Sequence, residues 1–171
     1  VKWVSMSPSA TPPSLFAGKV DAIAMFVLSR GFVAKIARKS GKKFSMMPYN
    51  KFGIDGYGIS FITSERKLAE MKGAIGKFIR ASQKGYAVAL ADGKKALAAF
   101  QKLYPEIPLR QTAGMWKGMK AFLLTPEAKK HGLLYMDENK VRMTRDLTVK
   151  YFNVPSVPLK DLYTNEFLAL K

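Results

Sequence analysis

The sequence contains no cysteine and only one histidine, His131, among its 171 residues. Without thiols there is neither a disulfide framework nor a thiolate metal site, and a single imidazole cannot build a zinc centre alone. No Ser-His-acid order is available beyond His131, no G-x-S-x-G elbow exists, and the acids are scattered rather than paired. The composition therefore predicts a protein that is not an enzyme and that uses no metal or cofactor.

Acidic residues are also scarce, with 12 Asp and Glu against 29 Lys and Arg and a formal net charge of +17. Such a field attracts phosphate, anionic lipid or acidic solutes, which makes a basic nucleic-acid-binding protein one alternative. However, the cations are dispersed singly or in pairs such as Lys42-Lys43, with no arginine-rich arm. This pattern is more typical of a solvated surface than of a nucleic-acid groove.

No apolar run approaches the ~20 residues that would span a bilayer, and no charged start followed by an apolar stretch predicts a secretion signal. The first residue is Val1 rather than Met, so we expect the chain to be processed or cut from something longer. Hydrophobic residues nevertheless make up 48% of the sequence, which is enough apolar surface to offset the entropy of ordering. We expect the chain to fold.

The first third of the sequence alternates short β-favouring runs with helical patterns, as parallel α/β layers do. The expected helices span residues 14–18 and 29–40. The expected strands are residues 1–6, 20–27, 44–49 and 59–63. Such a sheet binds ligands in the crevice at the carboxyl ends of its strands.

The rest of the sequence is dominated by helical periodicity. Ser64 is expected to cap a short helix and Asp92 a later one, while Thr125-Pro126-Glu127 is a helix-start signature. The helices expected here are 65–71, 72–91, 94–104, 111–124, a short turn ending at 132, 144–152 and 159–170.

Three stretches resemble one family in the same order: VDAIAMF, the long block GIDGYGISFITSERKLAEMKGAIGKFIRASQKGYAVALADGKKAL, and the tail DLYTNEFL. Together they resemble ABC-transporter solute-binding proteins of the thiamine-pyrimidine-precursor and sulfonate type, over almost the whole chain. The resemblance implies a bilobal α/β, type II periplasmic-binding-protein fold, of which this chain matches the carboxy-terminal portion with a helix-rich second half. Residues 1–55 would be the remainder of lobe 2, and residues 56–171 would return to lobe 1.

The resemblance implies a function in which the two lobes close on a small polar or heterocyclic solute, a pyrimidine precursor, sulfonate or similar. The implied partners are that solute and an ABC permease, and a dimer through exposed lobe edges is a further expectation. The implied location is periplasmic, or extracellular with a membrane tether. Some relatives of this fold make the thiamine pyrimidine enzymatically, but that alternative requires a cysteine-rich motif that this sequence lacks.

Two groups of residues at the expected crevice are candidates for ligand binding. In the turn 7–14, the hydroxyls of Ser7, Ser9 and Thr11 precede a helix start, where they either donate to an anion or simply cap the helix. Met25 and Phe26 end an expected strand, where a thioether and a ring suit a flat heterocycle, although core packing is the alternative.

The loop 54–58 contributes the third group, Asp55, Gly56 and Tyr57. Glycine allows close backbone approach, tyrosine offers a ring and a hydroxyl, and aspartate accepts from a ring amine. The alternative is a tight turn in which Asp55 satisfies its own backbone. Trp116 could also face a ligand, but we assign it to the core, because large aromatics are mostly buried.

Overall fold

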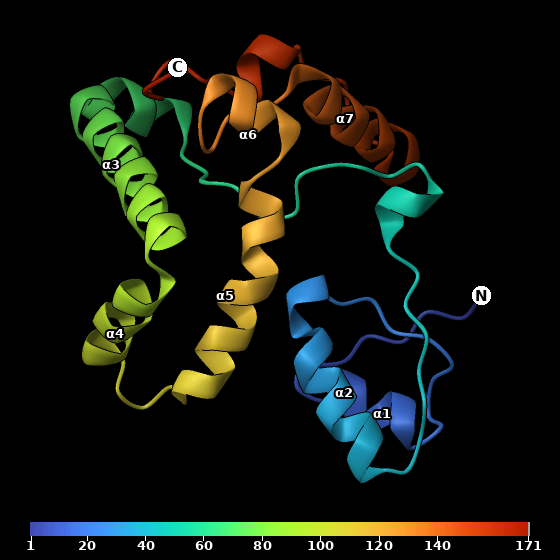
Figure 1. Cartoon of the computed structure of the whole chain (residues 1–171). Coiled ribbons are helices and arrows are strands. Elements are labelled where there is room, and N and C mark those ends of the chain that lie inside the picture. The colour runs from blue at the N-terminus through green and yellow to red at the C-terminus, as the bar shows by residue number, and fades with distance from the viewer. Residues whose placement is uncertain (171) are drawn as a thin grey trace. The chain divides into compact units, whose positions relative to one another are not determined.

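The structure, a computed structural model of the whole chain, describes residues 1–170. It divides into two compact units, Val1–Pro48 (unit 1) and Tyr49–Lys171 (unit 2), and each is described by itself. Figure 1 shows that both units are built from helices joined by extended chain, and no strand occurs between residues 1 and 170. None of the helices in this range has both the length and the apolar content needed to cross a membrane.

Unit 1 consists of α1 (Thr11–Phe16), the 3-10 turn η1 (Val27–Ser29) and α2 (Arg30–Lys39). Val33 and Ala37 lie one turn apart on α2, so they share the face that is buried against Phe16 of α1. The ring of Phe44 meets the edge of Phe16 with ring centres 6.2 Å apart. The expected helix at 29–40 is therefore confirmed, and its apolar face holds the small core of unit 1.

Unit 2 begins with the 3-10 turn η2 (Tyr49–Phe52) and continues through α3 (Glu65–Ala91), α4 (Gly93–Leu103) and α5 (Leu109–Leu123). The side chain of Ser64 accepts from the Lys67 N–H and that of Asp92 from the Lys95 N–H, so both predicted N-caps are confirmed. The helices predicted at 65–71 and 72–91 are one helix, but Met71 has non-helical dihedral angles at the expected break.

The end of unit 2 contains α6 (Pro126–His131), α7 (Glu138–Phe152) and the 3-10 turn η3 (Leu159–Asp161). α7 begins earlier than the predicted residue 144, because the Asp137 carboxylate accepts from the N–H groups of Asn139 and Lys140 and caps the helix there. The helix predicted over 159–170 is wrong beyond η3. Here the Asn165 side chain bonds to both backbone groups of Met136, which holds the segment in an irregular path.

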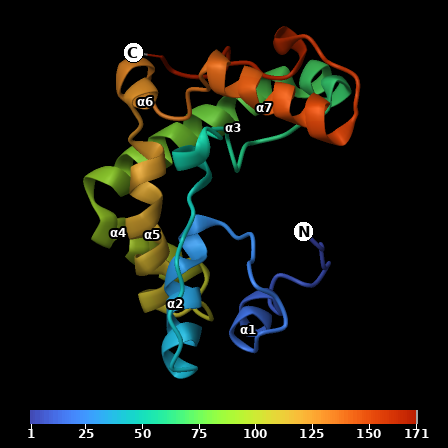
Figure 2. The same cartoon turned by 90° about the vertical axis from the view of Figure 1, so that its right-hand side faces the viewer.

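A buried glutamine, Gln83, joins α3 to the two later segments that complete unit 2. Its amide nitrogen donates to the carbonyls of Leu133 at 2.8 Å and Ala169 at 3.3 Å, and its amide oxygen accepts from the Ala169 N–H at 2.8 Å. Figures 1 and 2 show the carboxy-terminal segment returning beside α6. The Gln83 side chain thus connects α3 by hydrogen bonds to the segment at Leu133 and to the segment at Ala169.

The four predicted strands are the main correction to the sequence analysis. Residues 1–6, 20–27, 44–49 and 59–63 lie outside β-structure, mostly as extended chain with a 3-10 turn entering the second and third segments. A strand exists only through the hydrogen-bonded ladder to its neighbour, and β-propensity measures the fit to a pleated, half-buried surface. These segments have the composition of strands but no neighbouring strand between residues 1 and 170, so they remain unpaired.

Replacing Gln83 should destabilise unit 2 strongly. In Gln83→Ala the backbone groups of Leu133 and Ala169 lose their partners while remaining partly buried, which should lower the free energy of unfolding by about 2–3 kcal/mol. Urea unfolding followed by far-UV circular dichroism measures the change. The control is Gln111→Ala on the exposed surface of α5, which should change it by less than about 0.5 kcal/mol. Equal effects of the two variants would contradict this role for Gln83.

Candidate functional site

The predicted loop 54–58 lies against the start of α7, and Tyr57 makes the shortest contact there. The backbone N–H of Asp137 donates to the Tyr57 hydroxyl oxygen at 2.6 Å, and the Tyr57 side chain is half-buried. Asp137 is the residue that caps α7. The backbone at the start of α7 therefore positions Tyr57, although Tyr57 and Asp137 are 80 residues apart in the sequence.

Lys140, one turn into α7, brings two carboxylates together. Its ammonium nitrogen lies 3.1 Å from Asp55 Oδ2 and 3.9 Å from Glu127 Oε1, and its side chain is 22% exposed. The backbone N–H of Asp55 also donates to the Met143 sulfur at 3.3 Å. The alternative in which Asp55 satisfies only its own loop is not what the structure shows, because the carboxylate reaches α7.

The close approach of the loop to α7 favours glycine at position 56. A Cβ added to it would lie 2.5 Å from Thr144 Oγ1, closer than real Cβ contacts. Thr144 Oγ1 is held in place because it donates to the Lys140 carbonyl at 2.9 Å. The three predicted residues Asp55, Gly56 and Tyr57 therefore lie at one place in unit 2, together with Lys140 and Glu127.

The electrostatics of this cluster follow from its partial burial. Burial raises the pKa of Tyr57 above its ordinary value of 10.0, against the opposing effects of the Asp137 N–H and the Lys140 charge. Burial by itself would lower the pKa of Lys140, but the hydrogen bond and charge of Asp55, with the charge of Glu127, raise it overall. The Glu127 backbone N–H and the Thr125 hydroxyl lower the pKa of Glu127. At neutral pH the cluster therefore contains a neutral Tyr57 phenol, a Lys140 ammonium and a Glu127 carboxylate.

The predicted turn in unit 1 offers fewer donors than its sequence suggests. Thr11 Oγ1 donates to the Ser7 carbonyl at 3.0 Å, and the hydroxyls of Ser7 and Ser9 lie 3.3 Å apart. The N-cap of α1 is Ala10, which makes no side-chain cap bond, so the hydroxyls do not cap the helix. Pro12 and Pro13 have no N–H, so the first turn of α1 has few backbone donors for an anion.

Met25 and Phe26 lie on the extended chain just before η1 and are not part of a core. Phe26 is 62% exposed and Met25 is also exposed. The core-packing alternative for these two side chains is therefore wrong. Their side chains are accessible to a ligand, whereas the hydroxyls of Ser7, Ser9 and Thr11 hydrogen-bond within their own turn.

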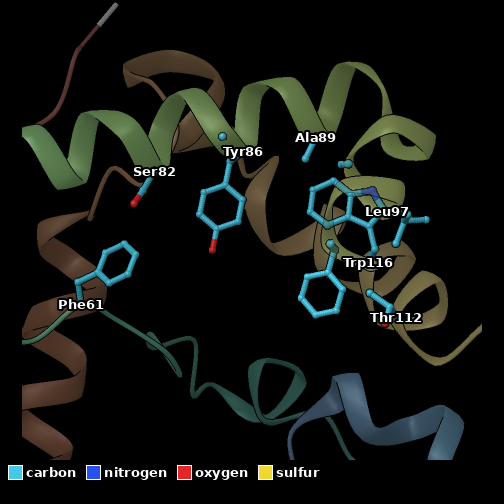
Figure 3. A pocket seen from close by; sticks show the side chains of 10 residues that line it. Phe61, Ser82, Tyr86, Ala89, Leu97, Thr112 and Trp116 are labelled. Carbon is cyan, nitrogen blue, oxygen red and sulfur yellow. The ribbon is translucent and has the colours of Figure 1, made fainter. Parts of the chain in front are cut away.

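A cavity in unit 2 was not predicted from the sequence. It has a volume of about 350 Å³ and is lined by residues of α3, α4 and α5 together with Phe61. Trp116, which the sequence analysis assigned to the core, lines it, and Tyr86 and Ser82 extend from α3 (Figure 3). The signal available in the sequence was the spacing of Ser82, Tyr86 and Ala89, which places small residues beside one ring on a single helix face.

Comparison with known proteins identifies the family of the chain and the class of protein that this family includes. A family model described as NMT1/THI5 like matches residues 1–96, which is more than half of the chain. This family includes solute-binding proteins of ABC transporters, and binding of a small solute is what it implies. The chain belongs to the NMT1/THI5-like family. No curated protein and no solved structure matches the chain.

The alkaline stability of the protein should depend on Tyr57. Because its pKa is raised above 10.0 in the folded state, its contribution is complete below pH 10 and is lost as the pH rises through the folded-state value. Tyr57→Phe removes this titration, so the free energy of unfolding should fall less steeply above pH 10 than in the parent. Urea unfolding at pH 8–11 tests this, with the exposed Tyr49→Phe as control. Parallel curves for Tyr57→Phe and the parent would exclude the role.

The pair of Lys140 and Asp55 should show a small but measurable coupling. The Asp55 side chain is 55% exposed, so solvent screens the pair, and a double-mutant cycle with Lys140→Met and Asp55→Asn should give about 0.5–1 kcal/mol. The coupling should shrink in 1 M salt, where screening acts over about 3 Å. Additive effects of the two substitutions at low salt would mean that the contact does not contribute.

Proposed function

We propose that the protein is the substrate-binding component of an ABC importer and captures a small polar or heterocyclic solute, such as a pyrimidine precursor or a sulfonate. The observation that supports this proposal is the family match over residues 1–96, which includes all eight predicted ligand-binding residues. We further propose that binding requires the complete α/β, type II fold, in which two lobes close on the solute.

The chemistry of the Asp55–Tyr57–Lys140 cluster suits such a solute. The Lys140 ammonium can donate to a sulfonate or carboxylate, which would replace the exposed Asp55 carboxylate as its partner. The Asp55 carboxylate can accept instead from a ring amine, and the Tyr57 ring can pack on a flat heterocycle. The cluster can therefore hold a ligand that carries both an anionic group and a nitrogen donor.

Lobe closure would provide the transport signal. A ligand that contacts both lobes binds the closed state more tightly than the open one and shifts the population toward it. A permease that recognises only the closed state would then receive loaded protein. A periplasmic location, or an extracellular one with a membrane tether, is part of this proposal, as is association with a second copy through exposed apolar edges.

Binding rather than catalysis is the proposed activity of the cluster. Asp55 and Glu127 both lie beside the same ammonium, and the lowered pKa of Glu127 makes it a poor general acid at neutral pH. Ion-paired carboxylates of this kind fix charge at a site. They suit recognition of a ligand better than proton transfer to it.

Solute binding should raise the melting temperature. A screen of pyrimidines, sulfonates, polyamines and amino acids should contain a compound that raises Tm by about 5–10 °C at a hundredfold excess over its Kd. Lys140→Met should abolish the shift for an anionic hit. Lys150→Met removes the same charge from the same helix and is the control, which should respond like the parent.

The alternative of nucleic-acid binding is supported by the net charge of +17 and has its own readout. Counterion release makes such binding fall steeply between 50 mM and 200 mM salt, whereas a solute-induced Tm shift should hardly change. No hit in the screen, combined with tight DNA binding at physiological salt, would overturn the transport proposal.

A further inference from the structure

The cavity in unit 2 has the size and lining of a site for a one-ring molecule. Its volume of about 350 Å³ is at the lower end of the roughly 300–1,000 Å³ typical of small-molecule sites. α4 packs on α3 and α5 packs on α4, so its walls are consecutive helices. None of the eight residues predicted to bind the transported solute lines it. The cavity is therefore separate from the site of the proposed function.

Aromatic rings form much of the wall. Figure 3 shows the rings of Tyr86 and Trp116 on opposite sides of an open space below α3, with Phe61 toward one end. Aromatic pairs prefer offset or edge-to-face contacts with ring centres about 4.5–7 Å apart. A flat ring between Tyr86 and Trp116 can make such contacts with both, which a saturated ring of the same size cannot.

The polar groups of the lining are hydroxyls, and no lining residue is charged. Ser82 Oγ donates to the Phe78 carbonyl at 2.9 Å and so remains free to accept. In Figure 3 the Tyr86 hydroxyl points away from α3. The Lys120 ammonium lies 5.8 Å from the centre of the Trp116 ring but is not part of the lining, so an ionised ligand inside the cavity would lose water without gaining a charged partner there.

Two further polar atoms of the lining are unsatisfied. Thr112 Oγ1 and Trp116 Nε1 are buried without a hydrogen-bond partner in the described part of the chain. Thr112 differs in this from Thr144 and Thr148, whose hydroxyls donate to the carbonyl four residues earlier. Such an unpaired group costs about 1–3 kcal/mol, but both atoms are shielded from solvent and Trp116 Nε1 packs against Gly93 of α4. The lining hydroxyls that a polar ligand atom can reach are therefore those of Ser82 and Tyr86.

We infer that this cavity binds a neutral, single-ring aromatic or heteroaromatic molecule that carries one hydrogen-bonding group, held between Tyr86 and Trp116 with its polar group at the hydroxyls of the lining. The inference does not depend on the transport proposal, since it uses only residues of α3, α4, α5 and Phe61.

The test uses Trp116 as the reporter in the full chain. The sequence has two tryptophans, and Trp3 is 87% exposed in unit 1, so Trp3→Phe leaves Trp116 as the only indole. Titration with benzamide, followed by the indole N–H signal in nitrogen-15 NMR, should give a saturable shift. Cyclohexanecarboxamide, with the same amide on a saturated ring, and benzoate, with the same ring and a charge, should each bind at least tenfold more weakly.

Matched variants on α3 locate the binding. Ala89 lines the cavity and Ala87, two residues earlier, is exposed, so Ala89→Leu should weaken benzamide binding more than tenfold while Ala87→Leu leaves it unchanged. Tyr86→Phe should weaken it about three- to tenfold, since it loses one hydrogen bond. Circular dichroism melting must first show that each variant folds.

The inference is overturned if benzamide gives no saturable shift, or if Ala89→Leu and Ala87→Leu bind it equally. It is also overturned if the Trp116 signal changes with protein concentration and not with benzamide, because the cavity would then be a contact between copies of the chain. The solute screen with Lys140→Met does not depend on these outcomes. If benzamide does not bind, the transport proposal is still decided by its own screen.

Discussion

The position of the candidate site depends on one buried amide. Gln83 holds the backbone at Leu133 and Ala169 against α3, and Leu133 is only four residues from Asp137, which caps α7. Because the start of α7 supplies the Asp137 N–H and Lys140, the contact at Gln83 also sets where the loop of Tyr57 can dock. A side chain far from the candidate site in sequence thereby fixes its geometry.

Charge is distributed unevenly between the two candidate ligand sites of unit 2. Near the loop 54–58, Lys140 is balanced by Asp55 and Glu127, although the chain as a whole carries +17. The cavity is lined without any charge. The excess of lysine and arginine therefore lies on the solvated surface and attracts anions over long distances. Selectivity for one ligand over another would come from the surroundings of the loop 54–58 and of the cavity.

Local signals in the sequence predicted the helices well and the strands poorly. Caps such as Ser64 and Asp92 act within one turn, so the residues nearby contain the information needed to place them. A strand at 59–63 depends on a neighbour that the local sequence does not specify. The same limit applies to the candidate site. Asp55, Gly56 and Tyr57 were predicted from the chemistry of their loop. Lys140 and Asp137 were not predicted, because they lie more than 75 residues further along the sequence.

The unpaired extended segments account for the difference between the α/β fold expected from the sequence and the helical structure. Ile62 is 93% exposed and Phe61 is also exposed, so the segment 59–63 retains the apolar composition of a strand without its burial. Pairing such a segment would bury those side chains and satisfy its backbone groups, which would stabilise it. The lobe closure that we propose would require this pairing, because a crevice at strand ends exists only once a sheet has formed. The cavity is lined by residues of α3, α4 and α5, with Phe61 as the contribution of this segment, and it is present without a sheet. A chain without paired strands could therefore still bind an aromatic molecule there while being unable to close on a transported solute.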